Sequence, residues 1–262
     1  MSANPKPDEL LRAAVELAHE AGDILLEGYG RIHAPERKGR IDLVTEFDRR
    51  SETLLLAGLK RRFPTHAVLA EESGAHEGAA VRWLVDPLDG TTNYAHNYPF
   101  FCVSIAAEVE GKLTAAAVYD PVREELFTAT RDGGATLNGA RIRVSPIERV
   151  EDALLVTGFP YDVRENPVPI LSRFEAFLLR AQGVRRDGSA ALNLCYLAMG
   201  RFDGFWESHL SPWDMAAGVL ILEEAGGFAT DFAGRPLRLD GRQILASNTR
   251  LHDEMKEILA KV

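Results

Sequence analysis

The chain has 262 residues, 46% of them hydrophobic and 26% charged, which is typical of a globular protein and excludes a disordered or fibrous one. The net charge of −9 argues against a protein whose main work is to hold nucleic-acid phosphates. The longest apolar run, residues 215–222, falls far short of the roughly 20 residues that span a bilayer, and no secretory signal is evident. Two cysteines are too few for a disulfide framework, so we expect a soluble, cytoplasmic protein with no membrane partner.

Periodic apolar residues define the predicted elements. From Leu10 to Leu25 they recur at helical spacing, which predicts an amphipathic helix over 8–26 that ends before Gly28. The following segment, 32–41, is basic and contains Pro35, so we expect an exposed loop. Further helices are expected at 45–62, 168–182, 190–199, 213–225 and 249–261. Strands are expected at 67–70, 83–85, 103–109, 113–118, 126–129, 142–144, 153–156, 202–206, 228–230 and 244–246.

The order of these elements predicts the fold class. Helices come first, a β-rich middle follows, and the last third alternates helix and strand. This order favours an α/β (α+β) protein built from layers of sheet and helix. We expect two tightly joined halves, 1–145 and 146–262, which could also count as one domain.

The most informative segment is 83–93, Trp-Leu-Val-Asp-Pro-Leu-Asp-Gly-Thr-Thr-Asn. A predicted strand leads directly to Asp86 and Asp89, and Gly90 follows. Two carboxylates and the carbonyl of Leu88 are oxygen ligands of the kind that Mg²⁺ prefers, and amides at a following helix start would attract an anion. This combination suits a phosphate ester, but Asp-Gly and proline sequences are equally common in plain turns.

Spacing excludes three other phosphate-handling or metal motifs. The chain has no glycine-rich loop that ends in Gly-Lys-Ser/Thr, and Leu88 occupies a position where a calcium loop needs an acid. Asp86 and Asp89 are three residues apart, whereas the Asp-x-Asp-Gly-Thr motif of aspartyl-phosphate phosphatases places its acids two apart.

Three other acids have simple structural interpretations. Glu71 ends a predicted strand, where a solvated carboxylate is common. Asp48 follows Thr45 by three residues and Asp214 follows Ser211 by three, and both pairs fit capping boxes that open helices. Spacing alone would not assign a catalytic role to any of them.

Taken together, five motifs in register resemble the inositol monophosphatase family of magnesium-dependent, lithium-sensitive phosphatases over nearly the whole chain. They are Asp42-Leu43-Val44-Thr45 through Asp48, Glu71-Glu72-Ser73, Asp86-Pro87-Leu88-Asp89-Gly90-Thr91-Thr92-Asn93, Gly188-Ser189-Ala190-Ala191, and Trp213-Asp214 through Gly218. The resemblance implies an α-β-α-β-α sandwich.

The resemblance also implies roles for individual residues. One Mg²⁺ would be held by Glu71, Asp86 and the carbonyl of Leu88, a second by Asp86, Asp89 and Asp214, and a third, weaker one by Glu71 through water. Hydrolysis would use a metal-activated water and no phosphoenzyme, with Thr91, Asp48 and Glu71 as the catalytic residues. Substrate-binding residues would be Asp89, Gly90, Thr91, Gly188, Ser189, Ala190, Glu207 and Asp214.

The position of two basic segments departs from the family pattern. Lys38 lies one residue nearer to Asp42 than in the best-known members, which leaves its role toward phosphate open. Arg186-Asp187 occupies a variable place before Gly188, where a charge could alter substrate choice or a subunit contact.

The expected function is therefore hydrolysis of a polyol phosphate, in the first place myo-inositol 1-phosphate. Histidinol phosphate, fructose 1,6-bisphosphate and 3′-phosphonucleotides remain alternatives within the same chemistry. The alternative from another class is a regulatory protein that binds RNA or the transcription machinery on the same fold. A homodimer is expected from the family; nucleic acid is not required for the enzymatic function.

Overall fold

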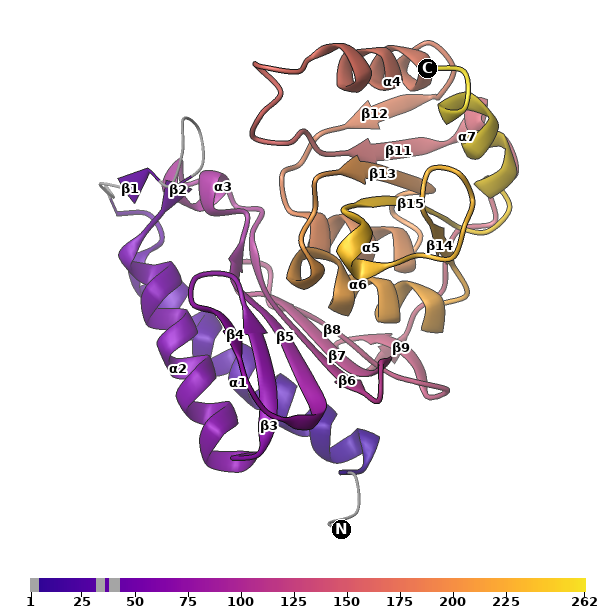
Figure 1. Cartoon of the computed structure of the whole chain (residues 1–262). Coiled ribbons are helices and arrows are strands. Elements are labelled where there is room, and N and C mark those ends of the chain that lie inside the picture. Colours follow the sequence, from indigo (N-terminus) through magenta and orange to yellow (C-terminus); the bar gives the residue numbers. More distant parts are fainter. Residues whose placement is uncertain (1–4, 32–35, 38–42) are drawn as a thin grey trace.

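The computed structural model describes residues 5–31, 36–37 and 43–262, so Asp42 and Lys38 lie outside the described residues. Figure 1 shows layers of helix and sheet stacked along the molecule. The first sheet has eight strands in the order β10-β9-β8-β7-β6-β5-β3-β4, and only β3 and β5 pair in parallel. Its strands are β3 (His66–Ala70), β4 (Gly74–His76), β5 (Ala79–Asp89), β6 (Cys102–Val109), β7 (Lys112–Asp120), β8 (Glu125–Thr130), β9 (Gly134–Leu137) and β10 (Ala140–Arg141).

The second sheet has five strands in the order β12-β11-β13-β15-β14. Strand β11 runs parallel to both of its neighbours, and β15 runs antiparallel to β13 and β14. The strands are β11 (Leu154–Thr157), β12 (Gly183–Arg185), β13 (Gly204–Ser208), β14 (Phe228–Thr230) and β15 (Gln243–Ser247). A separate two-stranded ribbon joins β1 (Glu36–Arg37) and β2 (Leu43–Val44).

Helices cover both faces of both sheets (Figure 1). Helices α1 (Pro7–Gly28) and α2 (Glu46–Arg62) pack on the outer face of the large sheet, and α4 (Val168–Leu178) and α7 (His252–Leu259) pack on the outer face of the small one. Helices α5 (Ala190–Ala198) and α6 (Pro212–Glu224) lie between the sheets, and short α3 (Thr91–Ala95) follows β5. Short 3-10 turns occupy Val150–Asp152 and Leu239–Gly241. The predicted α-β-α-β-α sandwich is confirmed.

Alternation along β5 assigns its side chains to two cores. Trp83 and Val85 face the layer of α1 and α2, whereas Leu84 faces α5 and α6, as the period of two in a strand requires. Because both faces are covered, β5 is apolar on both sides, which is why the sequence shows a continuous apolar run there.

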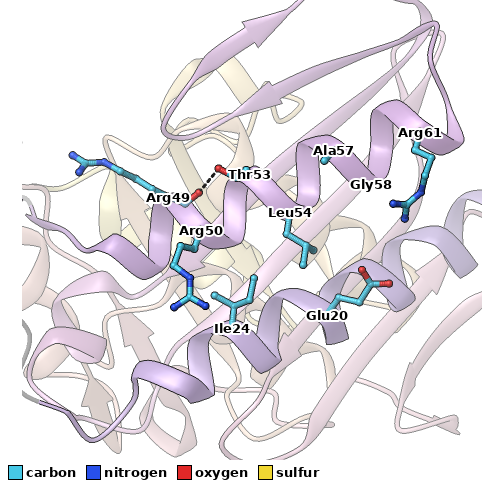
Figure 2. A pocket seen from close by; sticks show the side chains of 9 residues that line it. All are labelled: Glu20, Ile24, Arg49, Arg50, Thr53, Leu54, Ala57, Gly58 and Arg61. Carbon is cyan, nitrogen blue, oxygen red and sulfur yellow. Dashed lines mark hydrogen bonds between the residues drawn. The ribbon is translucent and has the colours of Figure 1, made fainter.

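A groove of about 520 Å³ lies between the two outer helices of the large sheet. Figure 2 shows Ile24 of α1 and Leu54 of α2 pointing toward one another in it, with Arg49 and Arg50 at one end and Arg61 at the other. No predicted site residue lines this groove. The groove and the predicted site are therefore different places.

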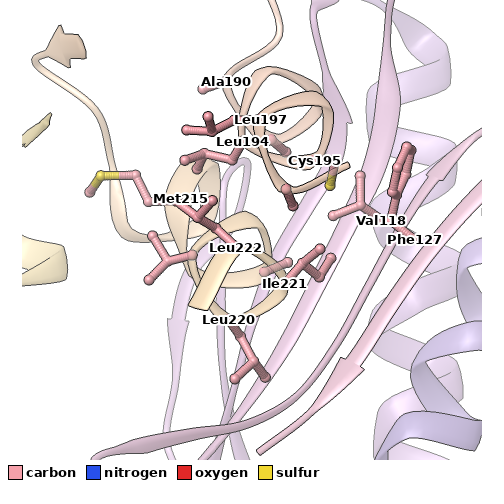
Figure 3. Packing of buried hydrophobic residues seen from close by; sticks show 14 of the residues in the cluster. Val118, Phe127, Ala190, Leu194, Cys195, Leu197, Met215, Leu220, Ile221 and Leu222 are labelled. Carbon is pink, nitrogen blue, oxygen red and sulfur yellow. The ribbon is translucent and has the colours of Figure 1, made fainter. Parts of the chain in front are cut away.

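The middle layer explains why α6 is apolar on several sides. Leu220, Ile221 and Leu222 are consecutive residues with no exposed surface, because α6 is enclosed by α5 and the two sheets. Figure 3 shows Ile221 beside Val118 of the large sheet, and Leu222 directed away from that sheet. This shared core joins the two halves of the chain. The proposed boundary at residue 145 stays a prediction.

The structure differs from the predicted elements in several places. The expected strand at 142–144 is wrong, because the chain pairs earlier, as β10, and residues 142–144 form no strand. Strands β4 and β12 were not predicted, and helix α4 ends at Leu178 rather than at 182. Helix α7 begins at His252, later than expected. In the described part of the chain no helix is both long and apolar enough to cross a membrane.

Candidate functional site

The Asp-Pro-Leu-Asp segment forms the irregular end of β5. The strand continues to Asp89, but its pairing with β6 is shifted between Asp86 and Asp89, where Pro87 has no amide hydrogen to donate. Asp86 is 2% exposed, and its Oδ1 accepts a hydrogen bond from the amide of Leu88 at 3.0 Å. The irregularity is therefore stabilised by a hydrogen bond within the segment, and it keeps both aspartates at the carboxyl end of β5.

Gly90 makes the turn from β5 into α3. Its φ of 100° lies in the region that favours glycine, and a Cβ there would stand 3.0 Å from the carbonyl oxygen of Phe100. Its backbone carbonyl accepts a hydrogen bond from the amide of Tyr94, which begins the helix. The amides of Gly90 and Thr91 thus lie at the start of a helix that follows the two aspartates, where the sequence predicted a helix start.

Asp48 uses one carboxylate oxygen to cap α2 and the other to contact Thr91 of the candidate site. Its Oδ2 accepts hydrogen bonds from the amide of Thr45 at 2.9 Å and from the Thr45 hydroxyl, which is the predicted capping box of α2. Its Oδ1 accepts a hydrogen bond from the Thr91 hydroxyl at 3.0 Å, and that hydroxyl also lies 3.1 Å from the carbonyl of Leu88. The pair Asp48–Thr91 is therefore assembled from segments 43 residues apart.

Asp214 and Glu71 approach the β5 aspartates from two other elements. Asp214 sits in the first turn of α6, where its Oδ2 accepts a hydrogen bond from the amide of Ser211 at 2.7 Å in the predicted capping box. Glu71 follows β3, and its amide donates to the carbonyl of Val85 at 3.3 Å. Both Asp214 and Glu71 act electrostatically on Asp86.

Burial and neighbouring carboxylates raise the pKa values of Asp86 and Asp214, and burial raises that of Asp89. Burial first, and then Glu71, Asp89 and Asp214, hold the pKa of Asp86 well above its usual range. Burial likewise raises the pKa of Asp89 to about 6, and burial followed by the charge of Asp89 raises that of Asp214 well above normal. Within the part of the chain that the structure covers, no ion pair with Lys, Arg or His involves Asp86, Asp89 or Asp214. Among the described residues, Asp86, Asp89 and Asp214 are thus grouped without a basic side chain to neutralise them.

The chemistry of the donors fits a hard divalent cation. Carboxylates and the Leu88 carbonyl provide oxygen ligands, and the hydrogen bonds to Asp86 and Asp214 fall on one oxygen of each, so the second oxygen remains for a cation. Among residues 5–31, 36–37 and 43–262, however, no three His, Cys, Asp or Glu side chains stand close enough to form a ready-made metal site. The fit to a cation therefore lies in the chemistry of the donor atoms.

The predicted substrate-side residue Ser189 and its neighbour Ala191 contact Asp89 directly. Asp89 Oδ2 accepts hydrogen bonds from the Ser189 hydroxyl and from the amide of Ala191, both at 2.7 Å. Ser189 also accepts from the amide of Leu192 and caps α5. Gly188 has a φ of 87°, which turns the chain into this cap. The first turn of α5 therefore fixes one metal-ligand candidate.

Glu207 lies on the other side of this edge, at the end of β13. Its carboxyl group covers Gly158, where a Cβ would come within 1.9 Å of Glu207 Oε1. Burial raises the pKa of Glu207 to about 8, Arg186 lowers it and Asp89 raises it. Glu207 and Asp89 are therefore near enough to repel one another, as expected if both face one bound molecule.

Some contacts at the site were not predicted from the sequence. Ser51 of α2 donates to the carbonyl of Pro87 at 2.9 Å, and Glu52, which is 4% exposed, accepts from the amide of Glu72 at 2.8 Å. Asn93 donates to the carbonyls of Phe100 and Asp187, both at 2.7 Å, which links the two halves of the chain. Polar residues on the inward face of α2 were the only available signal for the first two.

Comparison with known proteins identifies the family of the chain. A sequence model of the inositol monophosphatase family matches residues 6–262. An inositol-1-monophosphatase from Synechocystis is 45% identical over 256 residues, covering 95% of this chain and 88% of that protein. The Nus factor SuhB of Pseudomonas aeruginosa is 45% identical over 251 residues, with 92% of each chain covered.

Solved structures give the same result. The inositol monophosphatase from Anabaena superposes with a TM-score of 0.89 at 44% identity, covering 97% of this chain and 96% of that one. The extragenic suppressor protein SuhB from Bartonella henselae superposes with a TM-score of 0.93 at 40% identity, covering 97% and 99%. The chain belongs to the inositol monophosphatase family, whose members are metal-dependent.

Proposed function

We propose that this protein is a Mg²⁺-dependent phosphomonoesterase that hydrolyses a polyol phosphate, in the first place myo-inositol 1-phosphate. The observation that carries the proposal is the mutual electrostatic interaction of Glu71, Asp86, Asp89 and Asp214, which come from different parts of the fold. Asp86, Asp89 and Asp214 form no ion pair with a basic side chain among the residues that the structure describes, and carboxylates held together in this way destabilise the protein unless cations or protons neutralise them.

Two Mg²⁺ ions are the expected occupants, with a third bound more weakly. Glu71, Asp86 and the Leu88 carbonyl would hold the first, Asp86, Asp89 and Asp214 the second, and Glu71 the third through water. When bound, such ions supply positive charge that activates a water and stabilises the departing oxygen of the alcohol.

The remaining steps belong to the protein's own groups. Asp48 accepts the hydrogen bond of Thr91, so the lone pairs of the Thr91 hydroxyl can orient the attacking water, and Thr91 can take a proton from that water as its own proton passes to Asp48. Glu71 would assist in this. The amides of Gly90 and Thr91 would donate hydrogen bonds to the phosphate. Asp214 would contact substrate from the first turn of α6.

The leaving alcohol would lie between α5 and β13. Asp89, Gly188, Ser189 and Ala190 line one side, and Glu207 on the other would accept hydrogen bonds from hydroxyl groups. Carboxylates bind hydroxyls and amines alike, so histidinol phosphate remains an alternative, as do fructose 1,6-bisphosphate and 3′-phosphonucleotides.

A phosphate-release assay tests the proposal directly. Inositol, histidinol, sugar and nucleotide phosphates are each incubated with the protein and Mg²⁺, and then with a chelator or Li⁺. We expect Mg²⁺-dependent release that is fastest with inositol 1-phosphate and that both additions suppress. Release unaffected by chelator, or no release from any ester, would refute the proposal.

The variant Asp89→Asn tests the metal assignment. Asparagine keeps an oxygen that can accept from Ser189 or Ala191, so we expect a folded protein with at least a hundredfold lower kcat. Circular dichroism verifies the fold. A folded Asp89→Asn protein with full activity would show that Asp89 is not a ligand.

A second function is favoured by the names of several relatives. Proteins 41–45% identical to this chain are named Nus factor SuhB. We therefore propose that this chain also binds RNA or the transcription machinery, independently of hydrolysis. Asp89→Asn should then bind RNA or purified RNA polymerase as tightly as the wild type in fluorescence anisotropy. Absence of micromolar binding by either protein would remove this function.

We also propose a homodimer. Light scattering coupled to size-exclusion chromatography should give about twice the chain mass of 28.9 kDa. A mass equal to one chain at micromolar concentration would contradict it.

A further inference from the structure

An acidic and a basic side chain, Glu207 and Arg186, contact two neighbouring residues near the proposed position of the leaving alcohol. Glu207 covers Gly158, and the guanidinium of Arg186 lies over the ring of Phe159, 5.6 Å from its centroid. Arg186 also donates to the carbonyl of Phe159 at 3.4 Å. Glu207 and Arg186 therefore both lie against the dipeptide 158–159.

Arg186 also borders a predicted substrate position. Its Nη1 would stand 2.7 Å from a Cβ placed on Gly188, so the side chain folds back over the turn that leads into α5. Asn93 fixes this turn by donating to the carbonyl of Asp187. Arg186 thus contacts both the turn that precedes Ser189 and Phe159, the neighbour of the glycine that Glu207 covers.

Arg186 is a positively charged residue that acts on Glu207, whereas the neighbouring acids repel its charged form. Asp89 of β5 and Asp214 of α6 both interact unfavourably with Glu207, whereas Arg186 favours its charged form. In the described structure no other positive group acts appreciably on Glu207. Arg186 and Glu207 do not form an ion pair within 4.0 Å. Their interaction is therefore a longer-range Coulomb attraction and not a direct salt bridge.

We propose that Arg186 is a positioning residue for Glu207: its positive charge favours the ionised Glu207 carboxylate, which accepts hydrogen bonds from the hydroxyl groups of the leaving alcohol. The pair would select hydroxylated phosphate esters over plain ones. This inference rests on the proposed function, because it assigns the specificity of the same site.

Neighbouring Arg185 provides a matched control. Like Arg186, it is exposed, but its guanidinium donates to the carbonyl of Val184 in its own strand. Arg185 is not among the charges that shift the pKa of Glu207. Arg185→Gln and Arg186→Gln therefore remove the same charge from adjacent positions, and only the second removes the charge that acts on Glu207.

The test measures KM and kcat of each variant with two substrates in Mg²⁺. Inositol 1-phosphate has a hydroxylated leaving group, and phenyl phosphate has none. We expect Arg186→Gln to raise KM for inositol 1-phosphate about tenfold with little change in kcat, and to leave phenyl phosphate unchanged. Arg186→Lys should restore most of the affinity, and Arg185→Gln should behave like the wild type.

A double-variant cycle distinguishes action through Glu207 from a local structural effect. In a Glu207→Gln background the substitution Arg186→Gln should have no further effect on KM, because the charge that it balances is absent. Equal losses with both substrates, or the same tenfold loss in the Glu207→Gln background, would overturn the inference. Wild-type protein that hydrolyses neither ester would instead refute the proposed function.

Discussion

Replacing Glu207 by glutamine should stabilise the metal-free protein at alkaline pH. Burial raises the pKa of Glu207 from its ordinary 4.5 to about 8 in the folded state. The folded protein then holds this proton more tightly than the unfolded chain does. Glu207 consequently contributes stability below pH 4.5, and this contribution is lost as the pH rises toward and through 8.

The magnitude follows from the size of the shift. A difference of this size corresponds to roughly 5 kcal/mol over the whole titration, of which about 3.5 kcal/mol falls between pH 5 and pH 8. Glu207 keeps some contact with solvent, which screens its charge, so we expect about 2 kcal/mol. Glutamine has nearly the same shape and does not titrate.

Urea unfolding with chelator at pH 5 and pH 8 measures this difference. The wild type should lose about 2 kcal/mol more free energy of unfolding between the two pH values than Glu207→Gln does. Glu165→Gln removes an exposed carboxylate and serves as the control, which should follow the wild type. Parallel pH curves for the wild type and Glu207→Gln would refute the idea that burial strains this carboxylate.

Substitutions at three further positions have expected outcomes. Gly90→Ala should destabilise the fold by about 1–2 kcal/mol and abolish most activity, because its φ of 100° and the nearby Phe100 carbonyl disfavour a Cβ; urea unfolding and phosphate release measure both effects. Thr91→Val should lower kcat at least tenfold at unchanged KM, whereas Thr91→Ser, which keeps the hydroxyl that bonds Asp48, should retain most of it; equal kcat values would contradict the role. Leu220→Ala should cost about 3 kcal/mol of unfolding free energy without changing KM, since it empties a fully buried position of the middle layer.

The sequence predicted the layered fold well because the hydrophobic periodicity of its long helices is unambiguous. Helix α2 begins within one residue of its expected position, since the Thr45–Asp48 capping box marks the start. Prediction was poorer for short edge strands. Strand β12 has only three residues and gains its pairing from β11, which lies far from it in sequence, so local pattern carries little information about it.

The spacing of residues in the sequence could not separate the acids of the candidate site from ordinary helix caps, because these acids serve both purposes. One oxygen of Asp48 caps α2 while the other binds Thr91, and one oxygen of Asp214 caps α6. The capping interpretation from the sequence was therefore correct, and it is compatible with a role in the site because a carboxylate has two oxygens. A cap fixes the carboxylate at the helix start, so its second oxygen is held in a defined direction without further support. Only the fold, which brings β5, α2, α6 and the end of β3 together, separates such acids from ordinary caps, and no pattern within a single helix can do so.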